Sequence, residues 1–392
     1  MIRFRLSNIC DFLLLLFMIM VTLGAYFETN VLLVALFIGI AGFIALINWK
    51  KVIESLNSPI VKYWWIFVFV TIISSVFNGA GANKFIFAEI SIFFIVFILI
   101  ILGDSNSFYR LFRNFILILS LLTFITYFIG LDFFSSIKEG TPYVTLDLKT
   151  GGMASIFEFR HYYACYLAIA LLSTLRYPFP NKVLQWSSLL ILSINIFLTS
   201  TRTIWFALLV LIIFKIKLKN KFVIKRNIIY TTLILVPFLI FIITTSDIFS
   251  NVWLRLIQIF ESDQNFGGVR LYTLTNGTMY ILQNWPRYFF LGGGPGFAMY
   301  WLKLNPFGFW TNAIDSQYVT IFMDFGILGL ISFLIPIFYI VLTKYRELES
   351  FHRDSMLIMA FSSLFFEIIG STTSIFVLWM TVFLSATLKK ND

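Results

Sequence analysis

Several stretches of this chain are long enough to cross a lipid bilayer as a helix and contain no charged residue. They are residues Thr29–Trp49, Tyr63–Asn83, Asn114–Leu131, Val183–Thr201, Asn227–Ser246, Phe325–Thr343 and Ile368–Leu388. A helix needs about 20 mostly apolar residues to cross the roughly 30 Å of hydrocarbon in a bilayer. We therefore expect lipid to be the solvent for most of this chain.

The composition supports the same expectation. Of 392 residues, 59% are hydrophobic, 19% aromatic and only 12% charged. Soluble domains average about 45–50% apolar and about 25% charged residues. These proportions exclude a soluble globule, a disordered chain, a coiled coil and a small disulfide-linked scaffold. We predict an all-α polytopic membrane protein that forms a single integral membrane domain over residues 1–392.

Shorter apolar runs fill the intervals and bring the predicted number of transmembrane helices to about 12. The predicted spans are residues 12–27, 30–48, 63–79, 85–102, 115–131, 161–175, 183–199, 203–219, 227–245, 316–343, 355–370 and 373–388. Two predicted outer segments are long, residues 132–160 and residues 246–315, the latter between the ninth and tenth spans. Loops of this length are uncommon unless they carry function, and we expect 246–315 to be a folded cap that forms part of the active site.

The distribution of basic residues predicts the orientation. With the N-terminus inside, 20 of the 29 Lys and Arg residues fall in inner segments, which places both termini in the cytoplasm. The net charge of +10 is explained by these short connections, so we expect no nucleic-acid partner.

The outer arginines run against this bias and are candidate ligands for a phosphate or diphosphate. Arg202, in Ser200-Thr201-Arg202, opens the eighth predicted span, where helix N–H groups and the positive dipole end face outward. Arg255 and Arg270 lie in the long outer loop, and Arg160 lies where the first outer loop re-enters the membrane. The alternative for Arg202 is a helix cap bound to a lipid headgroup, and for Arg255 and Arg270 ordinary solvent or headgroup contact.

Three further residues are candidates for proton transfer or for a costly charge in the membrane. Asp315 is either a general base at the membrane surface or the N-cap of the tenth span. His161, the one histidine near the predicted outer face, is either a proton-transfer group or an interfacial residue among tyrosines. Asp324 falls inside the tenth span, where a carboxylate is a functional candidate by default. No pair of histidines or carboxylates has metal-ligand spacing, so we expect no metal and no cofactor.

A set of ordered motifs resembles the O-antigen ligase/polymerase superfamily of membrane glycosyltransferases. The motifs, which extend over roughly residues 150–345, are Ser200-Thr201-Arg202, Gly268-Val269-Arg270-Leu271-Tyr272, Gly292-Gly293-Gly294-Pro295-Gly296-Phe297, Asp315-Ser316-Gln317-Tyr318 and the helix with Gly326-Ile-Leu-Gly329. In ligases of this family histidine and asparagine usually stand where this chain has Asp315-Ser316. That difference makes the chain resemble the polymerase branch.

The resemblance implies a C-type glycosyltransferase fold without a metal and an undecaprenyl-diphosphate-linked oligosaccharide as donor and as acceptor. Arg202 and Arg270 would then hold the diphosphate at the periplasmic face of the bacterial inner membrane. Trp285, Tyr300, Trp301 and Trp310 are candidates for stacking on sugar rings. Besides membrane lipid, the implied partners are a chain-length regulator and a flippase.

The resemblance predicts an O-antigen or related surface polysaccharide polymerase, which transfers a growing lipid-linked chain onto a new lipid-linked repeat. Two alternatives remain open: a ligase that joins the finished chain to lipid A–core, and a lipid-linked oligosaccharide flippase. A flippase is expected to place its cationic residues in a central cavity and to have short outer loops, whereas here a 70-residue loop covers the outer arginines.

Overall fold

The computed structural model describes residues 6–24, 31–78, 84–129, 155, 157, 160–199, 201–218, 272–306, 314, 316–340, 350–364, 378 and 380–382. All regular secondary structure in these residues is helical. The helices are α1 (Leu6–Gly24), α2 (Val31–Ile47), α3 (Trp49–Leu56), α4 (Pro59–Phe77), α5 (Lys84–Leu102), α6 (Ser105–Ile129), α9 (Arg160–Arg176), α10 (Lys182–Leu198), α11 (Arg202–Leu218), η1 (Thr273–Gly277), α15 (Thr278–Gln283), α16 (Phe297–Leu304), α17 (Gln317–Phe338) and α18 (Ser350–Ser362).

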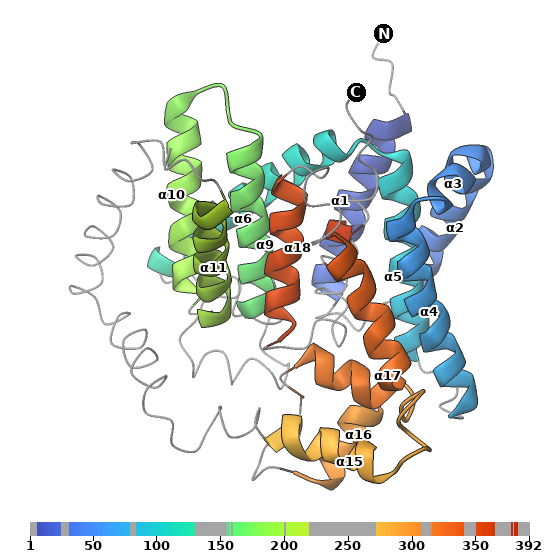
Figure 1. Ribbon diagram of the computed structural model, residues 1–392. Helices are drawn as coiled ribbons and strands as arrows, with labels where there is room; N and C mark the ends of the chain where they lie inside the picture. The colour runs from blue at the N-terminus through green and yellow to red at the C-terminus, as the bar shows by residue number, and fades with distance from the viewer. Residues whose placement is uncertain are drawn as a thin grey trace.

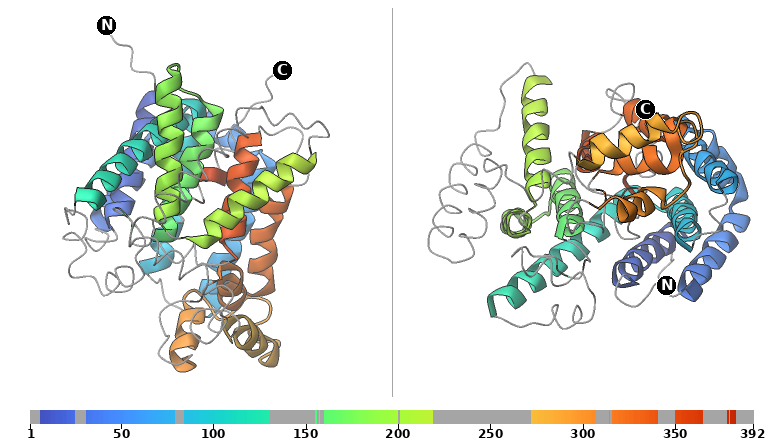
Figure 2. Two further views of the ribbon diagram at one scale, coloured as in Figure 1. Left: turned by 90° about the vertical axis from the view of Figure 1, so that its left-hand side faces the viewer. Right: turned by 90° about the horizontal axis from the view of Figure 1, so that it is seen from below.

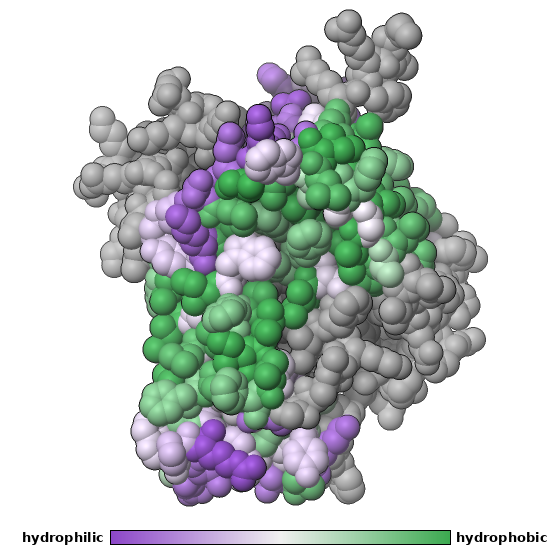
Figure 3. Space-filling view, turned by 90° about the vertical axis from the view of Figure 1, so that its right-hand side faces the viewer, coloured by the Kyte–Doolittle hydropathy of each residue, from purple (hydrophilic) through white to green (hydrophobic). Residues whose placement is uncertain are grey.

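Several helices are apolar enough for membrane insertion. Four of the described helices, α1, α4, α6 and α17, are long and apolar enough to cross a bilayer, and α2 with α3 forms a fifth candidate that bends by 94°. Bulky apolar side chains such as Phe43 and Phe69 point outward, with 66% and 62% of their surface exposed. Figure 3 shows an apolar band between two hydrophilic ends. The predicted number of twelve spans stays a prediction, and the span 227–245 lies outside the described residues.

The helices form two packed groups that α6 joins (Figures 1 and 2). In the first, α4 packs along α17, while α5 contacts α1 and α2. Trp64 of α4 is fully buried and meets Phe333 of α17 edge to face, with ring centroids 5.5 Å apart. In the second group, α9 and α10 pair as a hairpin, and α18 contacts α9 and α11. Large aromatic side chains therefore form much of the contact between helices that are distant in sequence.

Two predicted boundaries near the basic connections are wrong, and one helix was not predicted. Helix α6 begins at Ser105, ten residues before the predicted start, because Phe108, Tyr109 and Phe112 recur at helical spacing and are all buried. Arg110 and Arg113 therefore belong to a helix and not to a connection. The predicted spans also missed α3, which carries Lys50 and Lys51 on its exposed side.

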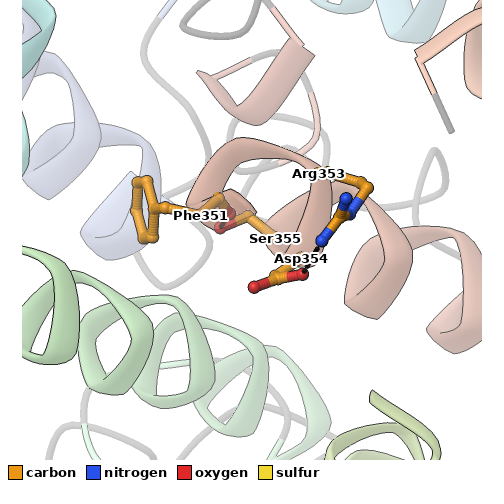
Figure 4. Close-up of polar contacts among 4 residues, drawn as sticks. All are labelled: Phe351, Arg353, Asp354 and Ser355. Atoms are coloured by element: carbon orange, nitrogen blue, oxygen red, sulfur yellow. Dashed lines mark hydrogen bonds and ion pairs between the residues drawn. The ribbon is translucent and has the colours of Figure 1, made fainter. Parts of the chain in front are cut away.

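The second wrong boundary is the start of α18, at Ser350, which brings His352 and Arg353 from a predicted inner loop into a buried helix. Arg353 and Asp354 form an ion pair, with 3.5 Å between Nη2 and Oδ1, and both are more than nine-tenths buried (Figure 4). The Ser355 hydroxyl donates to the Phe351 carbonyl within the same turn. Their burial follows from the apolar residues Phe351, Met356 and Met359 on the same helix, which pack into the core.

Helix α17 is broken at Gly326, and the glycine loop Gly292–Gly296 packs directly against the break. Gly326 has φ +68° and ψ −165°, a conformation that favours glycine. The Gly293 N–H donates to Met323 O and the Gly294 N–H to Asp324 O, each over 2.9 Å. On the far side of the break, the Ile327 N–H donates to Phe289 O over 2.8 Å. The residues before and within the glycine loop thus supply hydrogen-bond partners for α17 on both sides of its break.

Two glycines permit this close approach. An added Cβ would lie 2.3 Å from the backbone of Asp324 at Gly292, and 2.4 Å from the backbone of Phe290 at Gly326. Both residues have φ +68°, which other residues adopt only with strain. The glycine-rich sequence is therefore explained by backbone packing against α17.

We expect Gly292→Ala and Gly326→Ala each to lower the free energy of unfolding by at least about 2 kcal/mol, because each adds backbone strain and an atomic overlap. The measurement is the apparent Tm of the purified protein in detergent. Gly42→Ala in α2 is the matched control, since its added Cβ meets nothing within 4 Å. Alanine variants at 292 and 326 that unfold at the wild-type temperature would contradict the packing argument.

Candidate functional site

The carboxylate of Asp324 holds the start of helix α16. Its Oδ2 accepts the Gly296 N–H over 3.0 Å and its Oδ1 accepts the Ala298 N–H over 2.7 Å. Asp324 is only 6% exposed, and the first N–H groups of a helix lack partners within the helix. A negative side chain at this position satisfies those donors and interacts favourably with the helix dipole. The carboxylate singled out from the sequence thus has a structural role in anchoring the segment 272–306.

The hydroxyl of Ser74 in α4 also contacts the glycine-loop region and α17. Its hydroxyl lies 2.5 Å from the carbonyl oxygen of Leu291 and 3.1 Å from that of Asp324. Leu291 directly precedes the glycine loop, and the Asp324 carbonyl also accepts the Gly294 N–H from that loop. Three segments, from α4, the loop and α17, therefore meet at one buried hydroxyl, which the sequence shows only as a serine in an apolar run.

Aromatic side chains cover α16 and the preceding segment. Tyr280 stacks on Tyr288 with ring centroids 6.2 Å apart, and Tyr272 stacks on Trp301 at the same separation. Trp301 is 4% exposed, so it belongs to this packed cluster and is not available to stack on a sugar ring. Trp285 and Tyr300 are exposed, so their rings are accessible for stacking on a sugar. Trp310 lies outside the described residues.

A tight turn sets the start of helix α11 at Arg202. The buried Thr199 donates its hydroxyl to Ile196 O over 2.7 Å, and Thr201 O accepts the Ile204 N–H over 3.1 Å. Trp205 donates from Nε1 to Ile196 O over 3.1 Å and stacks on Phe197, so the first turn of α11 folds back on α10. The backbone of Arg202 is therefore fixed as the first residue of α11, while its side chain lies outside the described part of the chain.

Helix α9 begins with Arg160 and His161, which are both half-buried. The His161 ring contacts the ring of Tyr162 edge to face at 4.3 Å. One turn further, the buried Tyr163 hydroxyl donates to Asn195 Oδ1 over 3.2 Å and lies 3.4 Å from Ser120 Oγ. Polar groups bonded across helices hold α6, α9 and α10 together at this level. The analysis of the sequence missed this network, although Asn195 within an apolar run was a signal for it.

The helix starts at Arg160 and Arg202 lie at one end of the molecule. The α9–α10 hairpin turns back on itself, and α11 begins directly after α10 ends, so α9 and α11 begin at the same end, although α11 then runs obliquely to both (Figure 2). Figure 1 shows α15 and α16 at that end, opposite the α9–α10 connection. The structure thus gathers two predicted arginine positions, His161 and the segment 272–306 at one end.

The other predicted site residues, Asp315, Arg255 and Arg270, lie outside the described residues. Ser316 occupies the N-cap position of α17, one residue after Asp315, and the Thr320 N–H donates to its carbonyl over 3.1 Å. The N-cap that was one alternative for Asp315 is therefore found at Ser316. Within the described part, no three His, Cys, Asp or Glu residues lie together as metal ligands would.

No protein-family model matches this chain, and no curated protein sequence matches it.

We expect Asp324→Ala to lower the apparent Tm and to speed hydrogen exchange at residues 296–304. The change leaves the buried Ala298 N–H without an acceptor, at a cost of about 1–3 kcal/mol, and also removes the acceptor of the part-buried Gly296 N–H. Asp324→Asn keeps an acceptor oxygen, so we expect an intermediate effect. Glu54→Ala, which removes an exposed carboxylate of α3, is the control. An Asp324→Asn variant with wild-type stability and exchange but no activity would contradict the structural role and make Asp324 a reacting group.

Proposed function

We propose that this chain is a membrane glycosyltransferase that polymerises a bacterial surface polysaccharide, of the O-antigen polymerase kind. It transfers a growing undecaprenyl-diphosphate-linked glycan onto a new lipid-linked repeat at the periplasmic face of the inner membrane. The observation that supports the proposal is the common end of the molecule at which α9 and α11 begin, with Arg160 and Arg202 as their first residues, beside the folded segment 272–306.

The start of a transmembrane helix suits a diphosphate for two reasons. Its first N–H groups are free to donate, and the helix dipole places partial positive charge there. A guanidinium in the first turn adds a planar, permanently charged donor that binds phosphate oxygens in pairs. As a glycosyl bond to a lipid diphosphate breaks, negative charge develops on the leaving diphosphate, and such groups stabilise that charge. Arg202, Arg160, Arg255 and Arg270 are the proposed ligands.

An acceptor hydroxyl must also lie in line with the reacting carbon and lose its proton. Asp315, directly before the N-cap Ser316 of α17, and His161, at the start of α9, are the proposed candidates for the base. Asp324 would act one step away from the chemistry, because it fixes the glycine loop against α17. The exposed rings of Trp285 and Tyr300 offer surfaces for sugars at the same end.

We expect Arg202→Ala and Arg270→Ala each to abolish polymer formation while the protein stays in the membrane at a normal level. The measurement is the ladder of polysaccharide chains on a gel, with membrane fractions probed for the protein. Arg287→Ala is the matched control, because Arg287 is an exposed arginine of the outer segment that lies over the Tyr288 ring, 5.0 Å from its centroid. Normal polymer from both variants would contradict the diphosphate assignment.

Deleting the gene in its own host should leave a lipid A–core that carries a single repeat and no ladder. This result separates polymerisation from the two alternatives, because loss of a ligase or of a flippase leaves bare core. An unchanged ladder would contradict the role in this polymer. The proposed reaction itself is tested with the purified protein and a lipid-diphosphate-linked repeat, for which longer chains are the expected product.

A further inference from the structure

At the end opposite the outer segment, three arginines surround one cavity. It has a volume of about 440 Å³, and the described residues that line it are Arg110, Arg113, Arg176, Tyr177, Pro178 and Pro180. We call it the arginine cavity. It lies where the second and third turns of α6 meet the connection from α9 to α10, on the predicted cytoplasmic side.

Arg113 is held rigidly at the base of this group. It is 5% exposed, its Nε and Nη2 donate to Asn114 Oδ1 over 3.1 and 2.9 Å, and Nη1 donates to Tyr177 O. Its guanidinium carbon lies 3.7 Å from the ring centroid of Phe179. A buried positive charge of this kind is expensive unless negative charge is near. The oxygens that Arg113 binds here are neutral.

Arg110 and Arg176 are exposed and share one aromatic ring. Each guanidinium carbon lies 5.7 Å from the centroid of Tyr177, whose hydroxyl donates to Asn106 Oδ1 over 2.6 Å. The two charges are thus at most about 11 Å apart. This separation is comparable with the Debye length of about 8 Å at physiological ionic strength, so salt screens the two charges from each other only in part. Because a ring beneath a guanidinium restricts its motion, a ligand that binds both arginines loses less side-chain entropy.

The connection that carries Tyr177 is also fixed in place. Pro178 and Pro180 restrict its backbone, and Gln185 of α10 bonds it on both sides. Gln185 accepts the Phe179 N–H at Oε1 over 2.8 Å and donates from Nε2 to Thr174 O over 3.1 Å. The backbone on this side of the cavity is therefore held in place without a ligand, which favours binding.

We propose that the arginine cavity binds a phosphate group, supplied either by an anionic lipid headgroup or by a soluble anion. Three guanidinium groups around a preformed space match the charge and the hydrogen-bond acceptors of phosphate. The general excess of basic residues at the cytoplasmic face accounts for their side of the membrane, but not for their convergence on one ring and one cavity. Leu111, which follows Arg110 in α6, and Val183 and Leu184, at the start of α10, are exposed and apolar, as side chains that face lipid are. Basic pockets between helices at this face suit lipid phosphates.

The test compares the full-length protein in neutral detergent with the double variant Arg110→Gln/Arg176→Gln. Both residues are exposed, so the variant should fold, and Arg113 stays in place. The control is Lys50→Gln/Lys51→Gln, which removes two exposed charges from α3 at the same end. The probes are phosphatidylglycerol, phosphatidylcholine and inorganic phosphate, and the measurements are lipid retention by native mass spectrometry and the shift in apparent Tm.

We expect phosphatidylglycerol to bind more tightly than phosphatidylcholine, and the arginine variant to lose about 25-fold in affinity for it, at roughly fivefold per charge. The lysine control should keep wild-type affinity. If the source is a soluble anion, inorganic phosphate will raise the Tm of the wild type and of the lysine control but not of the arginine variant, and the two lipids will bind alike. Equal binding by the wild type and the arginine variant, or an equal loss in the lysine control, would overturn the proposal.

Discussion

The contact between the glycine loop and the break in α17 is the constraint on which the end of this protein that holds α15 and α16 depends. A transmembrane helix that is interrupted leaves N–H and carbonyl groups without partners, and lipid offers none. Here Phe289–Gly294 lies against both sides of the break and supplies partners for its backbone groups. The Asp324 carboxylate in turn accepts the N–H groups of Gly296 and Ala298 at the start of α16. Close backbone approach requires glycine at 292 and 326. The fold of the outer segment and the break in α17 are thus one feature.

The two ends of the molecule use arginine in different surroundings. At the end that holds the proposed site, Arg160 and Arg202 are the first residues of α9 and α11. At the opposite end, Arg113 is buried against Phe179, and Arg353 is paired with Asp354 inside the bundle. The basic residues that indicate orientation in the sequence are therefore also packed into specific structures.

Most of the helices could be predicted from the sequence, because apolar runs bounded by charges are a strong signal in a membrane protein. The errors came where a helix continues through charged residues, as α6 does through Arg110 and Arg113, since a charge count treats these as a connection. That α9 and α11 begin at the same end of the molecule agrees with the alternating direction of the predicted spans. The roles of Ser74 and Asp324 could not be predicted, because both act through backbone groups more than 20 residues away, as the separations of 217 and 28 residues show.

The hydrogen bond from Ser74 to Asp324 can form only late in the synthesis of the protein. The two residues are 250 positions apart, so at about 5–20 residues per second α4 is made roughly 10 to 50 s before its partner exists. During this time an apolar helix that lies in lipid has little free-energy cost from its uncovered face, because lipid tails are as apolar as the face that α17 later covers. During this interval the Ser74 hydroxyl can bond back within its own helix. The end of the molecule that holds α15 and α16 is therefore completed late in synthesis, by contact with a helix that is made early.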